Sequence, residues 1–158
     1  MLKFLLLSSL VFISQSSIPD QKFLALKNQL EKFGFQVIVA PVPPQDSPQL
    51  KVGFHSTRNP YGLLNSSKKT IWINPVVFDL QIGTPTLVHE SVHAAQVCAG
   101  GGKFKTLGLD IQPINNARPF FMRYRNVYAQ DLEKEAYTVQ SQPNRFELAT
   151  SLLQQNCR

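Results

Sequence analysis

Two of the chain's three histidines stand four residues apart, in the run His89-Glu90-Ser91-Val92-His93. On a helix, positions four apart differ by about 40° around the axis, so both imidazoles project from one face, at the spacing that a single tetrahedral zinc requires. Glu90 follows His89 directly, where its carboxylate can reach a metal-bound water rather than the metal. The run therefore predicts a Zn²⁺ site with Glu90 as its general base.

The residues around this motif are apolar, which predicts a half-buried helix: Leu87, Val88, Val92, Ala94 and Ala95. An unpaired imidazole in such a place costs free energy. The alternative is a pair of hydrogen-bonded structural histidines on an ordinary amphipathic helix. The motif spacing favours the metal site over that alternative.

This HExxH motif resembles that of the zincin metallopeptidases, in which the motif helix lies under a small mixed sheet whose edge strand binds the substrate chain. The metzincin branch has a glycine and a histidine three and six positions after the second motif histidine. Here those positions hold Gln96 and Ala99, and no histidine follows His93. The resemblance therefore points to the gluzincins, whose third zinc ligand is a glutamate.

A third ligand of that kind has to come from the carboxylates that follow the motif, which are Asp110, Asp131, Glu133, Glu135 and Glu147. Glu135 is the predicted ligand, because the Glu135-Ala136 pair resembles the ligand helix of gluzincins. Glu133 lies about 200° away on the same helix and is expected to point outward. Asp131, one turn before Glu135, could instead orient a ligand. Asp131 and Glu133 stay open as alternatives.

The resemblance implies hydrolysis of a peptide bond in a polypeptide substrate. Glu90 would take a proton from the zinc-bound water and pass it to the leaving amine. Gluzincins often add an acidic residue four positions after the ligand glutamate, where this chain has Val139. They also use a later His or a Tyr at the oxyanion, which leaves Tyr124, Tyr128 or Tyr137, and we assign that role to Tyr137.

The spacing of apolar residues and the turn residues predict the elements that position these groups. The motif helix is expected from Thr84-Pro85 to about Cys98. Further helices are expected at 19–33, closed by Gly34, at 127–140, and around 146–153. Strands are expected at 35–39, 50–55 and 70–73, with Trp72 packing in the sheet, and residues 57–69 and 103–118 as turns or irregular segments.

This order of elements predicts an α+β, zincin-like fold. In it, a small, mostly antiparallel or mixed sheet packs on the HExxH helix and on a second, ligand-bearing helix. The length of 158 residues fits one domain. We expect that domain to span residues 17–158 and to be a monomer.

The N-terminal segment and the two cysteines give information about the cellular location of the protein. Lys3 followed by an apolar run and small residues predicts a signal peptide over residues 1–16, which makes the protein secreted or periplasmic; the alternative is a retained helix in a cytoplasmic protein. No later segment is apolar for long enough to span a membrane. Cys98 and Cys157 can form a disulfide in an oxidising compartment or stay two separate buried thiols.

The composition argues against a disordered chain, because 43% of the residues are hydrophobic and only 16% are charged. The net charge of +6 and the basic, aromatic segment 103–125 leave room for a nucleic-acid-associated protein, although a solvated loop or the rim of a substrate cleft explains the segment as well. His55 ends the strand expected at 50–55, and we interpret it as a solvent-facing or turn-bonding residue rather than a catalytic one. A catalytically weak zincin-fold module that binds or inhibits a partner is the other alternative, and nucleic acid is not the expected partner.

Overall fold

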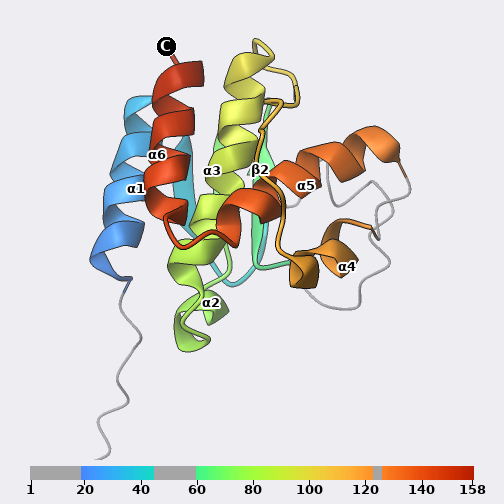
Figure 1. The fold of residues 1–158 in the computed structure, drawn as a ribbon. Coiled ribbons are helices and arrows are strands. Elements are labelled where there is room, and N and C mark those ends of the chain that lie inside the picture. Colours follow the sequence, from blue (N-terminus) through green and yellow to red (C-terminus); the bar gives the residue numbers. More distant parts are fainter. Residues whose placement is uncertain (1–18, 45–59, 123–125) are drawn as a thin grey trace, which may run out of the picture.

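The computed structural model describes residues 19–44, 60–122 and 126–158. Figure 1 shows the elements in chain order, which are α1 (Gln21–Lys32), β1 (Gln36–Val39), β2 (Gly62–Asn65), β3 (Thr70–Ile73), α2 (Val76–Asp79), α3 (Gly83–Ala99), a 3-10 turn (Asn115–Ala117), α4 (Arg118–Phe121), α5 (Val127–Gln140) and α6 (Arg145–Asn156). The predicted signal peptide and the predicted strand at 50–55, with His55, lie outside the described residues.

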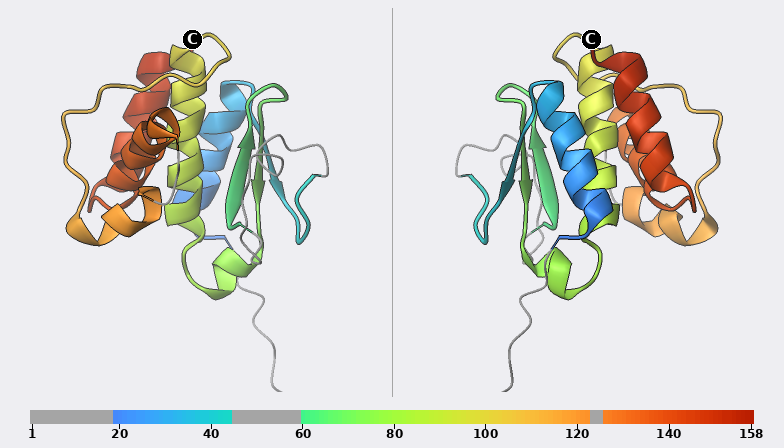
Figure 2. Two further views of the ribbon diagram at one scale, coloured as in Figure 1. Left: turned by 90° about the vertical axis from the view of Figure 1, so that its right-hand side faces the viewer. Right: turned by 90° about the vertical axis from the view of Figure 1, so that its left-hand side faces the viewer.

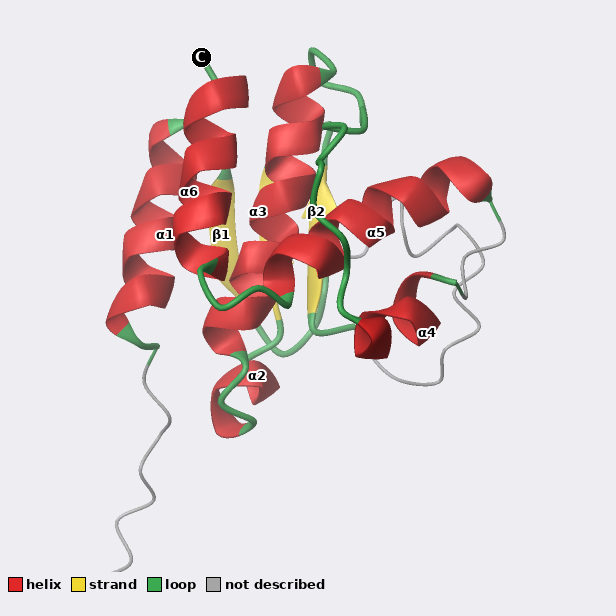
Figure 3. Ribbon diagram, in the orientation of Figure 1, coloured by secondary structure: helices red, strands yellow, loops and turns green. Residues whose placement is uncertain are grey.

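The three strands form one mixed sheet in the order β1-β3-β2. β1 runs parallel to β3, and β2 pairs with β3 antiparallel, with Leu63 opposite Trp72. The sheet forms one side of the molecule, and α1, α3, α5 and α6 lie together on its other side (Figures 2 and 3). The predicted α+β class with a small mixed sheet is therefore confirmed.

Helix α1 shows how the sequence builds this core. Phe23, Leu26 and Leu30 recur at helical spacing, and all three side chains are buried. The Asp20 side chain accepts a hydrogen bond from the Phe23 backbone N–H and caps the first turn. Gly34 follows the helix with a φ of +81°, the left-handed conformation predicted for it.

Strand β2 was not predicted, since residues 57–69 were expected to form turns. Gly62 and Asn65 are poor strand formers, and the pairing with β3 overrides their preference. The expected turn does follow β2, where the Asn65 side chain accepts hydrogen bonds from the Ser67 hydroxyl and the Lys68 N–H.

Helix α3 is the central element, with contacts to α1, α5, α6 and the sheet. It begins at Gly83, one residue before the predicted start at Thr84. The Thr84 hydroxyl does not cap the helix but donates to Asp20, which connects α3 to α1. A disulfide joins Cys98 near the end of α3 to Cys157 directly after α6. Among the described residues, no helix has the length and apolar character needed to cross a membrane.

Candidate metal centre

His89 and His93 lie one turn apart on α3 and face the same way, as the four-residue spacing predicts. Their Nε2 atoms are 3.1 Å apart and their rings meet edge to face. His93 is buried, and the His89 side chain is only 12% exposed. The helix therefore brings two imidazole nitrogens together at a site with little exposure to solvent.

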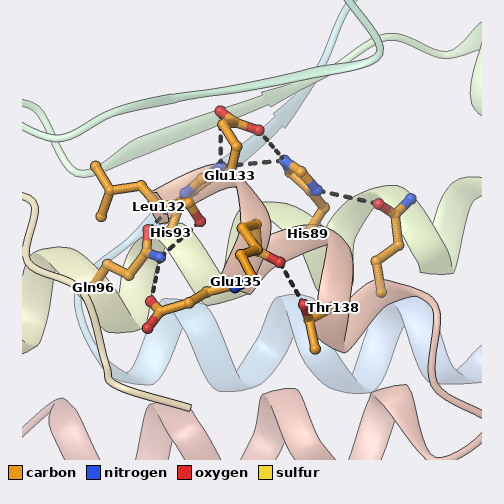
Figure 4. A network of polar contacts seen from close by, with 9 residues as sticks. His89, His93, Gln96, Leu132, Glu133, Glu135 and Thr138 are labelled. Carbon is orange, nitrogen blue, oxygen red and sulfur yellow. Dashed lines mark hydrogen bonds and ion pairs between the residues drawn. The ribbon is translucent and has the colours of Figure 1, made fainter. Parts of the chain in front are cut away.

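The third member of the cluster is Glu133 on α5. One carboxylate oxygen lies 3.2 Å from Nε2 of His89, and the other lies 3.5 Å from Nε2 of His93. Figure 4 shows this carboxylate directed at both imidazoles. Among the described residues, His89, His93 and Glu133 are the group of potential ligands that could hold a metal ion.

This arrangement corrects the prediction that Glu135 supplies the third carboxylate. Glu133 and Glu135 do point to opposite sides of α5, as the 200° offset requires, but the side that faces the histidines is that of Glu133. The other side is buried as well, against Gln96 and the segment after α3. Helical geometry alone predicts that the two glutamates point to opposite sides of α5. Which of them faces the histidines depends on how α5 packs on α3.

Glu135 receives hydrogen bonds on both of its oxygens. The Leu107 N–H donates to Oε2 at 2.8 Å, and the Gly108 N–H donates to Oε1 at 2.7 Å. Gly108 has a φ of +70°, so that successive backbone N–H groups converge on one anion. The Gln96 side chain donates to Oε2 at 2.9 Å. Glu135 therefore anchors the loop after α3, and Asp131 is exposed and does not belong to the histidine cluster.

A glutamine holds the Nδ1 atom of each histidine. Gln96 Nε2 donates to the Leu132 carbonyl and to Glu135, both of which only accept. Its Oε1 must then be the atom 2.8 Å from Nδ1 of His93, so that Nδ1 carries a proton and Nε2 presents a lone pair. Gln140 Oε1 lies 3.1 Å from Nδ1 of His89 and makes the matching contact from α5.

The charges of the cluster respond to one another. Burial lowers the pKa of His93, but Glu133 and, more weakly, Glu90 and Gln96 raise it to about 9. Burial raises the pKa of Glu133, yet the two imidazoles hold it well below its usual range. Without a metal ion, a second proton on Nε2 of His93 therefore balances the Glu133 carboxylate at neutral pH, and this proton has to leave before Nε2 can bind a metal.

The donor set fits a divalent metal such as zinc. Zinc bonds of about 2.0–2.2 Å place two tetrahedral ligands roughly 3.3–3.5 Å apart, which compares with the separations of 3.1, 3.2 and 3.5 Å between His89, His93 and Glu133. Oε2 of Glu133 is also a buried oxygen without a hydrogen-bond partner among the described residues. The two imidazoles in their Nδ1–H form and the Glu133 carboxylate thus direct three possible ligand atoms at one point.

Glu90 lies between the cluster and strand β2. Its side chain is buried, and a Cβ atom placed on Gly62 would come within 2.7 Å of Oε1 of Glu90. Burial raises the pKa of Glu90, and His89 and His93 only partly oppose this effect. The absence of a side chain at Gly62 therefore allows the Glu90 carboxylate to lie against the strand.

Strand β2 has backbone groups that do not pair with β3, at the edge of the sheet that lies against Glu90. The Asn74 N–H donates to the Tyr61 carbonyl at 2.9 Å, and in an antiparallel pair the hydrogen-bonded residues alternate. The N–H and C=O groups of Gly62 and Leu64 therefore point away from β3. Within the described part of the chain, no strand pairs with that edge.

Aromatic side chains surround the histidines. The Tyr137 ring lies 4.5 Å from the His89 ring and stacks on Phe120, and the Phe104 ring lies 6.0 Å from the His93 ring. Tyr137 and Glu133 are one turn apart on α5, so they share a face. Of the other candidate tyrosines, Tyr128 donates to the Phe104 carbonyl, and Tyr124 lies outside the described residues.

Sequence reasoning did not identify Gln96, Gln140 and Gly62 as parts of the site. One available signal was the polar series Glu133, Tyr137 and Gln140, which stands at i, i+4 and i+7 on one face of α5. Compared with known proteins, the chain matches no family model, no curated protein and no solved structure.

Proposed function

We propose that the protein is a zinc-dependent metalloendopeptidase in which His89, His93 and Glu133 hold the metal and Glu90 is the general base. The observation that carries the proposal is the convergence of the two Nε2 lone pairs and the Glu133 carboxylate within 3.1–3.5 Å of one another. Both imidazoles are oriented by hydrogen bonds on Nδ1, as metal-binding histidines usually are.

A bound zinc ion would supply a water of lowered pKa and a Lewis acid for a carbonyl oxygen. Glu90 would take the proton of the attacking water and deliver it to the leaving amine, since its carboxylate lies beside the cluster. Tyr137, on the same face of α5 as Glu133, would stabilise the developing oxyanion.

The edge of β2 supports a polypeptide substrate. The backbone groups of Gly62 and Leu64 that point away from β3 can pair with an extended chain. Such pairing would place a substrate backbone next to Glu90, because Gly62 lies directly against that side chain. We infer that the protein works after secretion, and the Cys98–Cys157 disulfide is consistent with an extracellular protein.

The test is the metal content and peptidase activity of the protein and of its Glu90→Gln variant. We expect about one zinc per chain in both proteins, by elemental mass spectrometry. We expect cleavage of a quenched peptide library by the wild type only, because an amide at position 90 cannot accept the proton. A wild-type protein without zinc would contradict the proposal, and a zinc-loaded wild type that cleaves no peptide would leave a binding module instead.

A further inference from the structure

The polar contacts of His93 continue through α3 to the loop after it. His93 Nδ1 donates to Gln96 Oε1 at 2.8 Å, and Gln96 Nε2 donates to Glu135 Oε2 at 2.9 Å. Glu135 in turn accepts from the N–H groups of Leu107 and Gly108. One unbroken series of hydrogen bonds therefore connects the histidine cluster to the backbone of residues 107–108. Figure 4 shows the part of this series from His93 through Gln96 to Glu135.

The chemistry of position 96 is specific. Gln96 is fully buried, and it must accept from an imidazole at one end and donate to a carboxylate at the other. Only a side-chain amide offers both groups in so short a span. A glutamate there would still accept from His93, but it would bring a second negative charge next to Glu135.

We propose that Gln96 and Glu135 are positioning residues, which fix the Nδ1–H form of His93 and tie the orientation of its ring to the loop at 107–108. Glu135 is then required for tight metal binding without being a ligand. The metal-binding part of this inference rests on the proposed function, whereas the hydrogen bond of His93 can be tested in the metal-free protein.

The first experiment follows the Nδ1 proton of His93 by NMR in the metal-free protein. We expect slow exchange with solvent in the wild type and fast exchange in Gln96→Met, which keeps the shape of the side chain but removes the acceptor. Unchanged protection in Gln96→Met would overturn the proposal. The result does not depend on zinc. It therefore distinguishes failure of the proposed hydrogen-bond series from His93 through Gln96 to Glu135 from failure of the proposed metal site.

The second experiment measures affinity for zinc by competition with a chromophoric chelator. Loss of an outer partner typically weakens binding about 10- to 100-fold, and we expect this for Gln96→Met and for Glu135→Gln. The exposed residues Glu147 and Gln155 on α6 provide matched controls, since Glu147→Gln and Gln155→Met make the same changes at surface positions outside the cluster. If Gln96→Met and Glu135→Gln both bind zinc with wild-type affinity, the proposal is contradicted.

The absorption spectrum of the Co²⁺-substituted protein distinguishes a positioning residue from a ligand. Glu135→Gln should keep the wild-type band shape at saturating metal, whereas Glu133→Gln should change it. The reverse result would make Glu135 the ligand and end the proposal. If Glu135→Gln does not fold, Gln96→Met, which leaves the contacts of Glu135 with the loop in place, decides the outcome.

A double variant that exchanges Gln96 and Glu135 provides a rescue test. Gln96→Glu alone sets two carboxylates against each other, and Glu135→Gln alone sets an amide against the donors that surround it. The double variant restores a donor and an acceptor between positions 96 and 135. We therefore expect it to bind zinc more tightly than either single variant, and additive losses would speak against a direct link.

Discussion

At the scale of single residues, the site depends on which ring nitrogen of each histidine is engaged by a hydrogen bond and which one faces Glu133. Both histidines have a glutamine on Nδ1, so both Nε2 atoms meet Glu133. Glu133 and Glu135 are both acidic and only two residues apart, yet one faces two imidazoles and the other faces backbone N–H groups. The chemical role of each carboxylate is set by what it contacts.

Gly62 provides a prediction at this scale. In Gly62→Ala, the new Cβ would lie 2.7 Å from Oε1 of Glu90, so the carboxylate has to move. Because small displacements of a catalytic group are costly, we expect kcat/KM for peptide cleavage to fall about 10- to 100-fold. Zinc content should stay unchanged, since the three atoms nearest to the new Cβ all belong to Glu90 and not to a proposed ligand. Ser67→Ala, in the turn beyond β2, serves as the control, and full activity of Gly62→Ala would contradict this account.

At the scale of elements, the centre is an interface between two helices. Helix α3 contributes both histidines and α5 contributes Glu133, so their relative placement decides whether the cluster exists. Ala136 and Val139 of α5 are buried in the core with α3 and α6. The disulfide from Cys98 to Cys157 holds the ends of α3 and α6 together, which keeps this layer of helices in place.

Removal of the disulfide should lower stability markedly. The bridge closes a loop across a sequence separation of 59 residues, and bridges of this kind contribute about 2–4 kcal/mol to the free energy of unfolding. We expect Cys98→Ala/Cys157→Ala to lose about that much in urea unfolding. A reductant should produce a similar loss in the wild type and no further loss in the double variant. Equal stability of the oxidised wild type and the variant would refute the prediction.

At the scale of the whole molecule, a bound cation would couple the site to global stability. The cluster gathers two imidazoles and a carboxylate from two helices, and metal binding to the native state alone raises its free energy of unfolding. The gain is about 2.7 kcal/mol at a free metal concentration of 100 times Kd.

Metal removal is accordingly predicted to lower the melting temperature. For a chain of this size, the expected shift is roughly 5–10 °C on treatment with a chelator, measured by scanning calorimetry. Glu133→Gln should show a much smaller shift, because it lacks one ligand. A wild-type melting temperature that does not respond to zinc or to the chelator would argue against a metal at this site.

Much of the fold could be predicted from local patterns. Apolar spacing was sufficient to predict α1, α3, α5 and α6, because an amphipathic helix carries its own period in its sequence. Strand β2 was missed, since Gly62 and Asn65 carry little strand preference of their own. Its existence depends on pairing with β3, which no local pattern describes.

The order of residues is enough to place His89 and His93 on one face of a helix with Glu90 beside them, because that geometry belongs to the helix alone. It is also enough to direct Glu133 and Glu135 to opposite sides of α5. The packing of the elements was needed to establish that Glu133 faces the histidines, that Gln96 links His93 to Glu135, and that Gly62 makes room for Glu90. Each of these facts is a contact between elements distant in the chain, and such contacts follow from how the helices and the sheet pack together.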